Sequence, residues 1–245
     1  MRVYAKSDIG LVRSTNQDDC QTGIFPDGAA WAVVCDGMGG ANGGSTASSL
    51  AVETIVQKLS EGYISDMDGE QLFALMGGAV ASANEAVYEA AQNDESLSGM
   101  GTTVVCAIVK NGKAHILHAG DSRAYFYDGS TVRQITKDHS IVQELVDLGR
   151  IDPEEARVHP NRNLITRALG IAPELLTDYN TVDFGESSVL LICTDGLSNY
   201  ITPERLLAFI QAGSGEELTD KLIEAAKELG GSDNITVAVI ASGED

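Results

Sequence analysis

The segment between residues 102 and 135 constrains the fold of this chain most strongly. Strand-like runs rich in Val, Ile and Tyr follow one another there, at 102–109, 114–117, 123–127 and 131–135. The dipeptides Asn111-Gly112 and Asp128-Gly129 lie between these runs, and both favour tight hairpin turns. A parallel sheet needs a helix between paired strands, and these intervals are too short for one. The sequence therefore predicts an antiparallel meander and argues against a doubly wound parallel sheet.

Helical patterns are separate from the strand patterns. Apolar residues recur at helical spacing over 45–59 and 72–90. Shorter helices are expected at 141–148, 206–210 and 218–229, and further strands at 31–35, 188–194 and 234–240. Each amphipathic helix has one apolar face to bury. We therefore expect fold class α+β, a sandwich in which sheets pack on each other and helices cover the outside.

The length and the cysteines indicate one domain in a reducing compartment. The chain has 245 residues, of which 43% are hydrophobic, and no linker or repeat divides it, so we expect a single domain spanning 1–245. Three of its four cysteines lie inside apolar runs and none forms a CxxC pair, which predicts buried thiols. Neither a signal peptide nor a membrane-spanning run is present, and we expect a cytoplasmic protein.

The net charge argues against two classes of partner. The sequence carries 16 Lys and Arg against 36 Asp and Glu, a formal net charge of −20. Such an acidic chain repels nucleic acids and anionic lipid headgroups, so neither nucleic acid nor membrane is expected as a partner. For most surface carboxylates, simple solubility explains the surplus equally well.

Four aspartates recur in one setting, beside Gly or Asn at an end of an apolar strand. They are Asp36, Asp121, Asp195 and Asp233. A lone Asp-Gly is usually a turn, and a turn requires a second strand directly afterwards. A Gly-rich loop and a helix follow Asp36 instead, and a polar, helical stretch follows Asp195. The repetition therefore favours a shared site over four separate turns.

Carboxylates gathered from distant segments would repel one another unless a cation lay between them. Mg²⁺ and Mn²⁺ prefer carboxylate, carbonyl and water oxygens, whereas the four histidines are too scattered for zinc or copper. The glycines after Asp36 would let the Gly37 carbonyl approach a metal. The same loop, GMGGANGG, lacks the Lys of a P-loop and departs from GxGxxG at Asn42. Arg13 is either a surface ion-pair partner or, beside a metal centre, a bidentate phosphate ligand.

Taken together, these residues resemble the metal-dependent serine/threonine protein phosphatases of the PP2C (PPM) type, in their compact bacterial branch. The resemblance extends over the whole chain, through SDIGLVRSTNQDD, VVCDGMGG, GMGTTVV, HAGDSRAY, TKDHSIVQELVDLGRIDPEEARVHP, LLICTDGL and GGSDNITVAVI. It implies an α-β-β-α sandwich of two antiparallel sheets flanked by helices. It also implies a binuclear Mn²⁺ or Mg²⁺ centre, with a possible third and weaker metal site.

The resemblance assigns roles to matching positions. Asp36 corresponds to the carboxylate that bridges both metals, and the Gly37 carbonyl to a ligand of one of them. Asp195 and Asp233 correspond to ligands of the other metal, and Asp121, with Asp195, to the holders of the third.

Further positions match residues around the metals. Arg13 corresponds to the phosphate clamp and Asp18 to a residue that orders metal-bound water. The segment 138–167 corresponds to a mobile flap beside the substrate groove.

Two positions depart from the pattern of other members. Gln17 stands where other branches have a metal-binding Glu, so water should replace that ligand. Ala41 stands where several relatives have a His proposed as proton donor, which leaves the general acid open. A metal-bound water, His139 or His159 are the alternatives, although both histidines are equally explained as structural.

The expected function is metal-dependent hydrolysis of phosphoserine and phosphothreonine in proteins by an activated water. The expected partners are phosphorylated proteins and a cognate Ser/Thr kinase, and the chain is expected to be a monomer. Cys35 and Cys193 adjoin the aspartates but lie in strand interiors without a Cx5R loop, which argues against a thiol nucleophile. Two alternatives stay open, an inactive module that binds phosphoproteins and a hydrolase of small phosphoesters.

Overall fold

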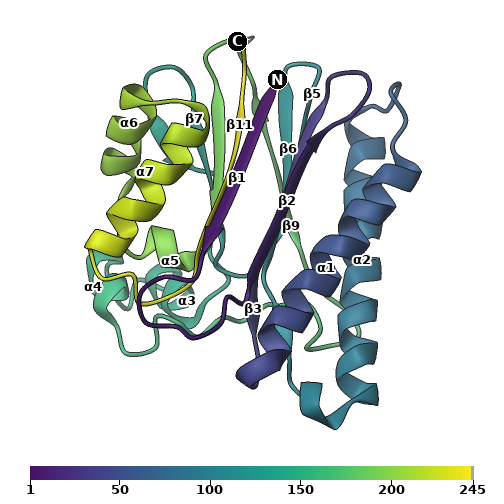
Figure 1. The fold of residues 1–245 in the computed structure, drawn as a ribbon, viewed down its shortest axis with the longest axis vertical. Helices are drawn as coiled ribbons and strands as arrows, with labels where there is room; N and C mark the ends of the chain where they lie inside the picture. The colour runs from purple at the N-terminus through teal and green to yellow at the C-terminus, as the bar shows by residue number, and fades with distance from the viewer. Residues whose placement is uncertain (244–245) are drawn as a thin grey trace.

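The computed structural model describes residues 1–243 of the chain, apart from the side chains of residues 41 and 42. Two antiparallel sheets face each other, and helices cover both outer faces (Figure 1). This arrangement confirms the predicted α-β-β-α sandwich. No helix within the described residues is long and apolar enough to cross a lipid bilayer.

The first sheet has five strands in the order β1-β11-β10-β7-β8. Their bounds are β1 Arg2–Asp8, β7 Arg123–Tyr127, β8 Val132–Gln134, β10 Val189–Cys193 and β11 Ile235–Ala241. Helices α6 (Pro203–Ala212) and α7 (Gly215–Glu228) cover its outer face (Figure 1). Along β11, Val237 and Val239 pack in the core beneath these helices, whereas Ala238 and Ile240 pack between the sheets. Alternate side chains of a strand point to opposite faces, and both faces of β11 are apolar because both are buried.

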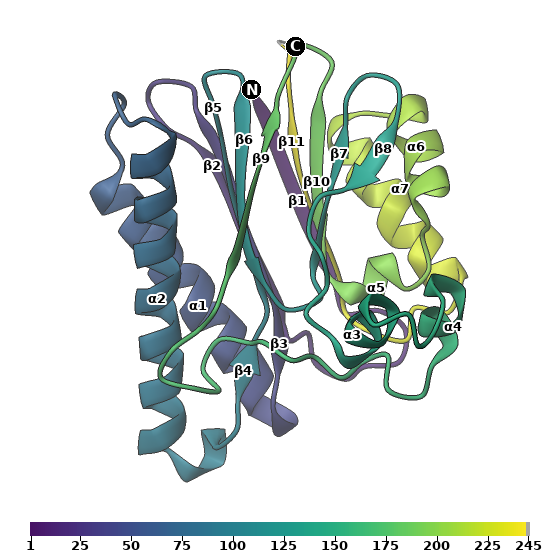
Figure 2. The ribbon, with the colours of Figure 1, turned by 180° about the vertical axis from the view of Figure 1, so that it is seen from behind.

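The second sheet has the path β2-β3-β5-β6-β9, and β4 pairs with the end of β3. Its strands are β2 Asp18–Ile24, β3 Ala30–Met38, β4 Gly101–Thr102, β5 Val104–Lys110, β6 Lys113–Ala119 and β9 Asp178–Asp183. Two long helices cover its outer face, α1 (Gly40–Gly62) and α2 (Gly69–Asn93), and the short 3₁₀ helix η1 (Glu95–Leu97) follows them (Figure 2). The apolar spacing over 45–59 and 72–90 therefore predicted two real helices.

The predicted meander is only partly correct. Asn111 and Gly112 have φ values of 49° and 71° and form the expected hairpin turn between β5 and β6. A second hairpin joins β7 to β8. However, β6 and β7 lie in different sheets, so the chain crosses the sandwich between them instead of continuing one meander. The sequence around a short connection looks the same whether the connection forms a hairpin within one sheet or crosses to the other sheet, because β6 and β7 are apolar on both faces.

Three strands that the sequence patterns did not predict, β1, β2 and β9, are edge strands. Their outward residues are polar or half-exposed, and β2 contains Asp and Gly, which have low strand propensity. Polar edges limit pairing with other chains and also weaken the local strand signal.

The buried-thiol prediction is confirmed for Cys35, Cys106 and Cys193, whereas Cys20 is half-buried. Burial raises the pKa of the Cys106 and Cys193 thiols to about 12, so neither is a thiolate near neutral pH.

The functional residues lie at one end of the sandwich. Both termini lie at the opposite end, at the top of Figure 1. The lower end holds the end of β3, the loop between β6 and β7, and the short helix α5 (Asp195–Ser198) (Figures 1 and 2). Helices α3 (Ile141–Asp147) and α4 (Pro153–Val158) lie beside it and belong to the segment 138–167.

Candidate metal centre

The four predicted aspartates and Arg13 line one cavity of about 400 Å³. Asp36 lies near the end of β3 in the six-stranded sheet, and Asp121 lies in the loop that crosses from β6 to β7, between the two sheets. Asp195 begins α5, directly after β10, and Asp233 precedes β11, and both of these strands belong to the five-stranded sheet. The cavity therefore lies at one end of the sandwich, where both sheets and the connection between them contribute carboxylates.

Burial and mutual repulsion both raise the pKa values of Asp36, Asp121 and Asp195. Burial, and then the charges of Asp18 and Asp195, raise the pKa of Asp36 well above its ordinary value. Burial and the charge of Asp195 raise the pKa of Asp121 to about 8. Burial and the charge of Asp233 raise the pKa of Asp195 to about 6. The site therefore holds more negative charge than its protein surroundings neutralise, which is the electrostatic condition for binding a cation.

Asp18 lies beneath the aspartates and is 9% exposed. Its Oδ2 accepts hydrogen bonds from the hydroxyls of Thr194, at 2.8 Å, and Thr236, at 2.7 Å. Its Oδ1 is buried and has no hydrogen-bond partner within the described residues. Burial raises the pKa of Asp18 to about 7, although both threonines oppose the shift. A buried oxygen without a donor, among acidic oxygens, fits a site that takes water or a hydrated cation.

Only glycine fits at position 37. A Cβ there would lie 2.0 Å from the carbonyl oxygen of Gly44 and 2.5 Å from that of Gln17. The Gly37 amide donates to the Gln17 carbonyl at 3.0 Å, and the Gln17 side chain donates to the Gly40 carbonyl at 2.9 Å. These contacts pack the Gly-rich loop against the N-terminal segment and bring Gly37 and Gln17 to the cavity wall.

Arg13 lies at the mouth of the cavity, with a side chain that is 52% exposed. Its Nη2 pairs with Oδ2 of Asp233 at 2.7 Å. Both of the sequence-based interpretations of Arg13 therefore have a structural basis, because the same guanidinium is an ion-pair partner and faces the carboxylate site.

Two neutral residues that shape the site were not identified from the sequence. Thr103 accepts a hydrogen bond from the Asp36 amide through Oγ1 at 3.0 Å and donates its own amide to the Asp36 carbonyl at 2.9 Å. Asn234 accepts from the Gln17 amide at 2.8 Å and donates to the carbonyls of Ile9 and Thr15. Both lie inside motifs already noted, but neutral side chains of this kind carry no charge pattern that would single them out.

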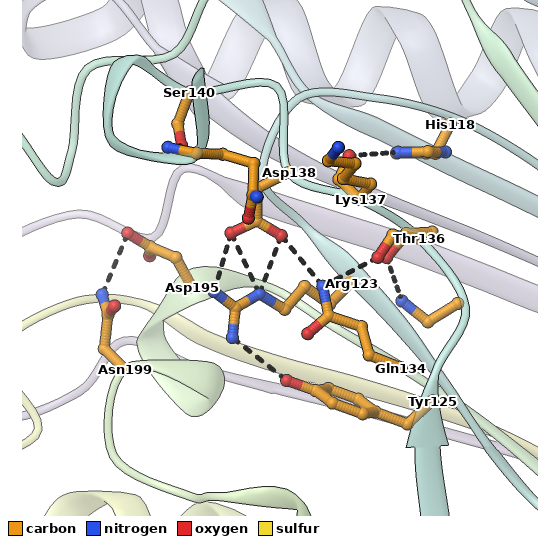
Figure 3. Close-up of polar contacts among 12 residues, drawn as sticks. His118, Arg123, Tyr125, Gln134, Thr136, Lys137, Asp138, Ser140, Asp195 and Asn199 are labelled. Carbon is orange, nitrogen blue, oxygen red and sulfur yellow. Dashed lines mark hydrogen bonds and ion pairs between the residues drawn. The ribbon is translucent and has the colours of Figure 1, made fainter. Parts of the chain in front are cut away.

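The segment 138–167 covers a second cavity, of about 260 Å³, which also has Asp121 and Asp195 in its wall. At the start of this segment, Asp138 binds Arg123 with two parallel hydrogen bonds, Nε to Oδ1 at 2.9 Å and Nη2 to Oδ2 at 2.7 Å (Figure 3). Arg123 also donates to the Tyr125 hydroxyl at 3.2 Å, and Asn199 donates to Asp195 at 3.2 Å (Figure 3). One ion pair and its hydrogen-bonded neighbours therefore border the aspartates on this side.

A second cluster with metal-ligand chemistry consists of His118, His139 and Asp178, whose ligand atoms lie within 4.8 Å of one another. The Gly120 amide donates to Nδ1 of His139 at 3.1 Å, and Nη1 of Arg167 lies 3.1 Å from Nε2 of the same ring. That Nε2 is 3.4 Å from Asp178 Oδ2, and Arg167 pairs with the same carboxylate at 2.8 Å. Because both ring nitrogens of His139 have partners and a guanidinium lies beside Nε2, this cluster is unsuited to metal binding and forms a hydrogen-bonded network instead.

Neither histidine considered as a general acid lines the aspartate cavity or the cavity beneath 138–167. His139 is 7% exposed and both ring nitrogens have partners. His159 accepts from the Asn161 amide at 3.1 Å, within the segment 138–167. The structure thus favours the structural explanation of both, while the side chain of Ala41 lies outside the part of the chain that is described.

Comparison with known proteins gives a consistent family. A model of the protein phosphatase 2C family matches residues 12–228. The serine/threonine phosphatase stp of Listeria welshimeri is 34% identical over 243 residues, which cover 98% of this chain and 95% of that protein. The serine/threonine protein phosphatase PstP of Mycobacterium tuberculosis is 38% identical over 240 residues, which cover 98% of this chain and 44% of PstP.

Solved structures agree with these sequence relatives. The crystal structure of the serine/threonine phosphatase Stp1 from Staphylococcus aureus has a TM-score of 0.91 and 31% identity, covering 99% of this chain and 95% of that one. The catalytic domain of PstP in complex with two manganese ions has a TM-score of 0.85 and 36% identity, covering 97% and 96%. The chain therefore belongs to the protein phosphatase 2C family, as a compact enzyme of the bacterial serine/threonine phosphatase type.

Proposed function

We propose that this enzyme hydrolyses phosphoserine and phosphothreonine in phosphorylated proteins, at a centre where Asp36, Asp195 and Asp233 hold two Mn²⁺ or Mg²⁺ ions. The observation that carries the proposal is the convergence of four carboxylates on one cavity, together with the raised pKa values of Asp36, Asp121 and Asp195, which indicate unneutralised charge. All of these donors are oxygens, the ligands that hard divalent cations prefer. The two manganese ions in the related PstP catalytic domain also support it.

In this proposal, Asp36 and the Gly37 carbonyl would hold the two principal ions together with Asp195 and Asp233. Asp121 with Asp195 would hold a third and weaker ion. Two divalent cations bound here supply the Lewis acidity that brings the pKa of a water molecule near neutrality.

Two residues act on water and substrate in this proposal. The unpartnered Oδ1 of Asp18 accepts a hydrogen bond from water in the site and so orients it. Arg13 binds two phosphate oxygens with its planar guanidinium and stabilises the charge that develops on them.

The proposal is tested with the purified chain, a phosphothreonine peptide and a titration of MnCl₂ against an EDTA control. We expect hydrolysis only with the metal, and we expect Asp36→Asn to reduce turnover to the background rate because one bridging charge is lost. Asp66→Asn, in the exposed loop between α1 and α2, is the matched control and should leave turnover unchanged. A wild-type rate for Asp36→Asn at saturating Mn²⁺ would refute the metal assignment.

The same assay separates the alternatives. An inactive binding module would retain the phosphopeptide without releasing phosphate, whereas a small-molecule hydrolase would prefer a phosphorylated metabolite to the peptide. The proposed protein substrates are products of Ser/Thr kinases, so the enzyme opposes such a kinase. Phosphoproteomics of a strain lacking this chain should then show added phosphate on serine and threonine of specific proteins.

A further inference from the structure

The segment 138–167, called the flap below, is closed at its root by backbone pairing. The Thr166 amide donates to the His139 carbonyl at 2.8 Å, and the Ile141 amide donates to the Leu164 carbonyl at 2.9 Å. Between these bonds, Ser140 and Ile165 form an antiparallel bridge. The two ends of the flap therefore leave the sandwich as one paired strip, with α3 and α4 beyond it.

Two Arg-Asp pairs fasten this root, one to each sheet. Arg123 on β7 holds Asp138 with two parallel hydrogen bonds, and Asp138 is only 10% exposed (Figure 3). Arg167, at the other end of the flap, pairs with Asp178 on β9 at 2.8 Å. The root is thus tied to both sheets of the sandwich, next to the candidate metal centre.

His139 lies between the two fastenings and holds Gly120 with two hydrogen bonds. Its backbone amide donates to the Gly120 carbonyl at 2.9 Å, and its Nδ1 accepts from the Gly120 amide at 3.1 Å. The ring stacks on His118 with centroids 4.7 Å apart, and His118 in turn bonds the Lys137 carbonyl (Figure 3). The imidazole is therefore fixed in one orientation with its acceptor toward Gly120.

Gly120 is the residue before Asp121, and its backbone is held on the other side as well. Its φ is +109°, and a Cβ there would lie 2.6 Å from the side chain of Thr103. Thr103 also holds the backbone of Asp36 and shares a hydrogen bond of 2.7 Å with Ser122. The turn that presents Asp121 is consequently clamped between Thr103, at the metal-site end of the six-stranded sheet, and His139, at the root of the flap.

We propose that His139 is a positioning residue that couples the root of the flap to the Gly120-Asp121 turn, so that flap position and Asp121 placement depend on each other. The proposal rests on the proposed function only for the role of Asp121 as a metal ligand. Coupling of this kind is reciprocal, so whatever restrains Asp121 also restrains the flap. The imidazole is suited to this position because its two nitrogens contact different partners, Nδ1 the Gly120 amide and Nε2 the Arg167-Asp178 pair.

Three variants separate these two contacts. His139→Asn keeps an acceptor near the position of Nδ1, His139→Gln keeps a polar group near Nε2 only, and His139→Ala removes both. His115→Gln is the matched control. His115 is also a buried histidine, but it lies on β6 and bonds Tyr179 instead of Gly120. The first readout is hydrogen exchange of the Gly120 amide in the full chain, followed by NMR without metal.

We expect wild-type exchange of the Gly120 amide in His139→Asn and His115→Gln. In His139→Gln and His139→Ala that amide should exchange roughly five- to tenfold faster, the effect of losing about one hydrogen bond. Equal exchange in the Asn and Gln variants would overturn the proposal. Because this readout uses no metal and no substrate, it remains decisive even if the enzyme fails to hydrolyse phosphopeptides.

The second readout is the coupling itself, measured as the rate of limited proteolysis within the flap. We expect MnCl₂ to slow flap cleavage in the wild type and in His139→Asn, and to have little effect in His139→Gln. Equal protection by Mn²⁺ in the Asn and Gln variants would show that the flap is coupled to the metal centre without His139. Absence of Mn²⁺ protection in the wild type would refute the coupling, whereas absence of hydrolysis with normal protection would count only against the proposed function.

Discussion

At the scale of single residues, Arg13 pairs with Asp233 at 2.7 Å and is half-exposed in the wall of the aspartate cavity. In the proposed function, the same guanidinium also binds the substrate phosphate. The ion pair with Asp233 keeps the Arg13 guanidinium at the site, and because the side chain is half-exposed, its other N–H donors are accessible to a ligand. The planar guanidinium of arginine has five N–H donors and can bind Asp233 and a phosphate together, whereas the ammonium group of lysine lacks this planar arrangement of donors.

Arg13→Ala should therefore raise KM for a phosphothreonine peptide more than it weakens Mn²⁺ binding. Arg13→Lys keeps the charge without the planar fork and should recover metal binding fully but KM only in part. Steady-state kinetics and calorimetric Mn²⁺ titration on the same preparations give both quantities. Loss of Mn²⁺ affinity with an unchanged KM would make Arg13 a structural ion-pair partner only.

Position 41 provides a second test at this scale, because the resemblance to the family implies a proton-donating His where this chain has Ala41. A serine alkoxide leaves poorly without a proton, whereas p-nitrophenolate leaves readily, and a general acid is worth about 10²- to 10⁴-fold in rate. Ala41→His should therefore accelerate hydrolysis of the phosphothreonine peptide relative to p-nitrophenyl phosphate, and the gain should vanish above the imidazole pKa. An equal change for both substrates at every pH would exclude an acid role for this position.

At the scale of secondary-structure elements, the junction of β3 with α1 sets the geometry of the site. The strand ends in Asp36-Gly37-Met38, and the helix begins at Gly40 within the Gly-rich loop. The backbone of α1 approaches so closely that the Gly44 carbonyl occupies the space of any side chain at position 37. Glycine is required there by packing against backbone, because the obstructing atoms cannot rotate away.

Gly37→Ala should consequently destabilise the fold by about 1–3 kcal/mol or more, the usual cost of overpacking. Gly78→Ala is the matched control, since it lies on the exposed side of α2 with nothing within 4 Å of its Cβ position. That change should stabilise the chain by about 0.5–1 kcal/mol through helix propensity. Urea unfolding of both variants measures the difference, and a neutral Gly37→Ala would contradict the close approach of α1.

At the scale of the whole molecule, the sandwich gathers carboxylates that an unfolded chain would keep apart. In the folded chain without metal, the pKa values of Asp195 and Asp121 rise to about 6 and about 8. The pKa of an unfolded aspartate is about 3.9. The folded state therefore binds more protons than the unfolded state between about pH 4 and pH 8, and stability falls as the pH rises through that window.

The melting temperature without metal should accordingly decrease from about pH 5 to about pH 8, and saturating Mn²⁺ should raise it by binding the folded state. Asp233→Ala should lose most of the Mn²⁺-induced rise. Thermal melts in EDTA and in MnCl₂ at several pH values measure both effects. A rise of equal size in the wild type and in Asp233→Ala would place the dominant metal elsewhere.

Local sequence patterns were sufficient to predict those features that depend on a few neighbouring residues of one segment. Helical spacing predicted α1 and α2, Asn111-Gly112 predicted a hairpin, and aspartates at strand ends predicted which four carboxylates would share a cavity. These features are local because the period of an element, the φ values of a turn and the direction of a strand end are properties of a few neighbouring residues.

Only the tertiary structure decided the features that depend on which segments meet. β6 and β7 look like successive strands of one sheet, and their separation follows from the turn at Gly120, which the sequence marks only by a glycine. The polar edge strand β9 contributes Asp178, which lies beside His139 at the root of the flap. The hydrogen bond from the Gly120 amide to His139 joins two residues that are 19 positions apart in the sequence. The sequence by itself determined the type of fold and the chemistry of the site, because charge and apolar period are carried by the residues. The pairing of side chains across the sandwich was decided by packing, because a contact between distant segments leaves no pattern in either segment alone.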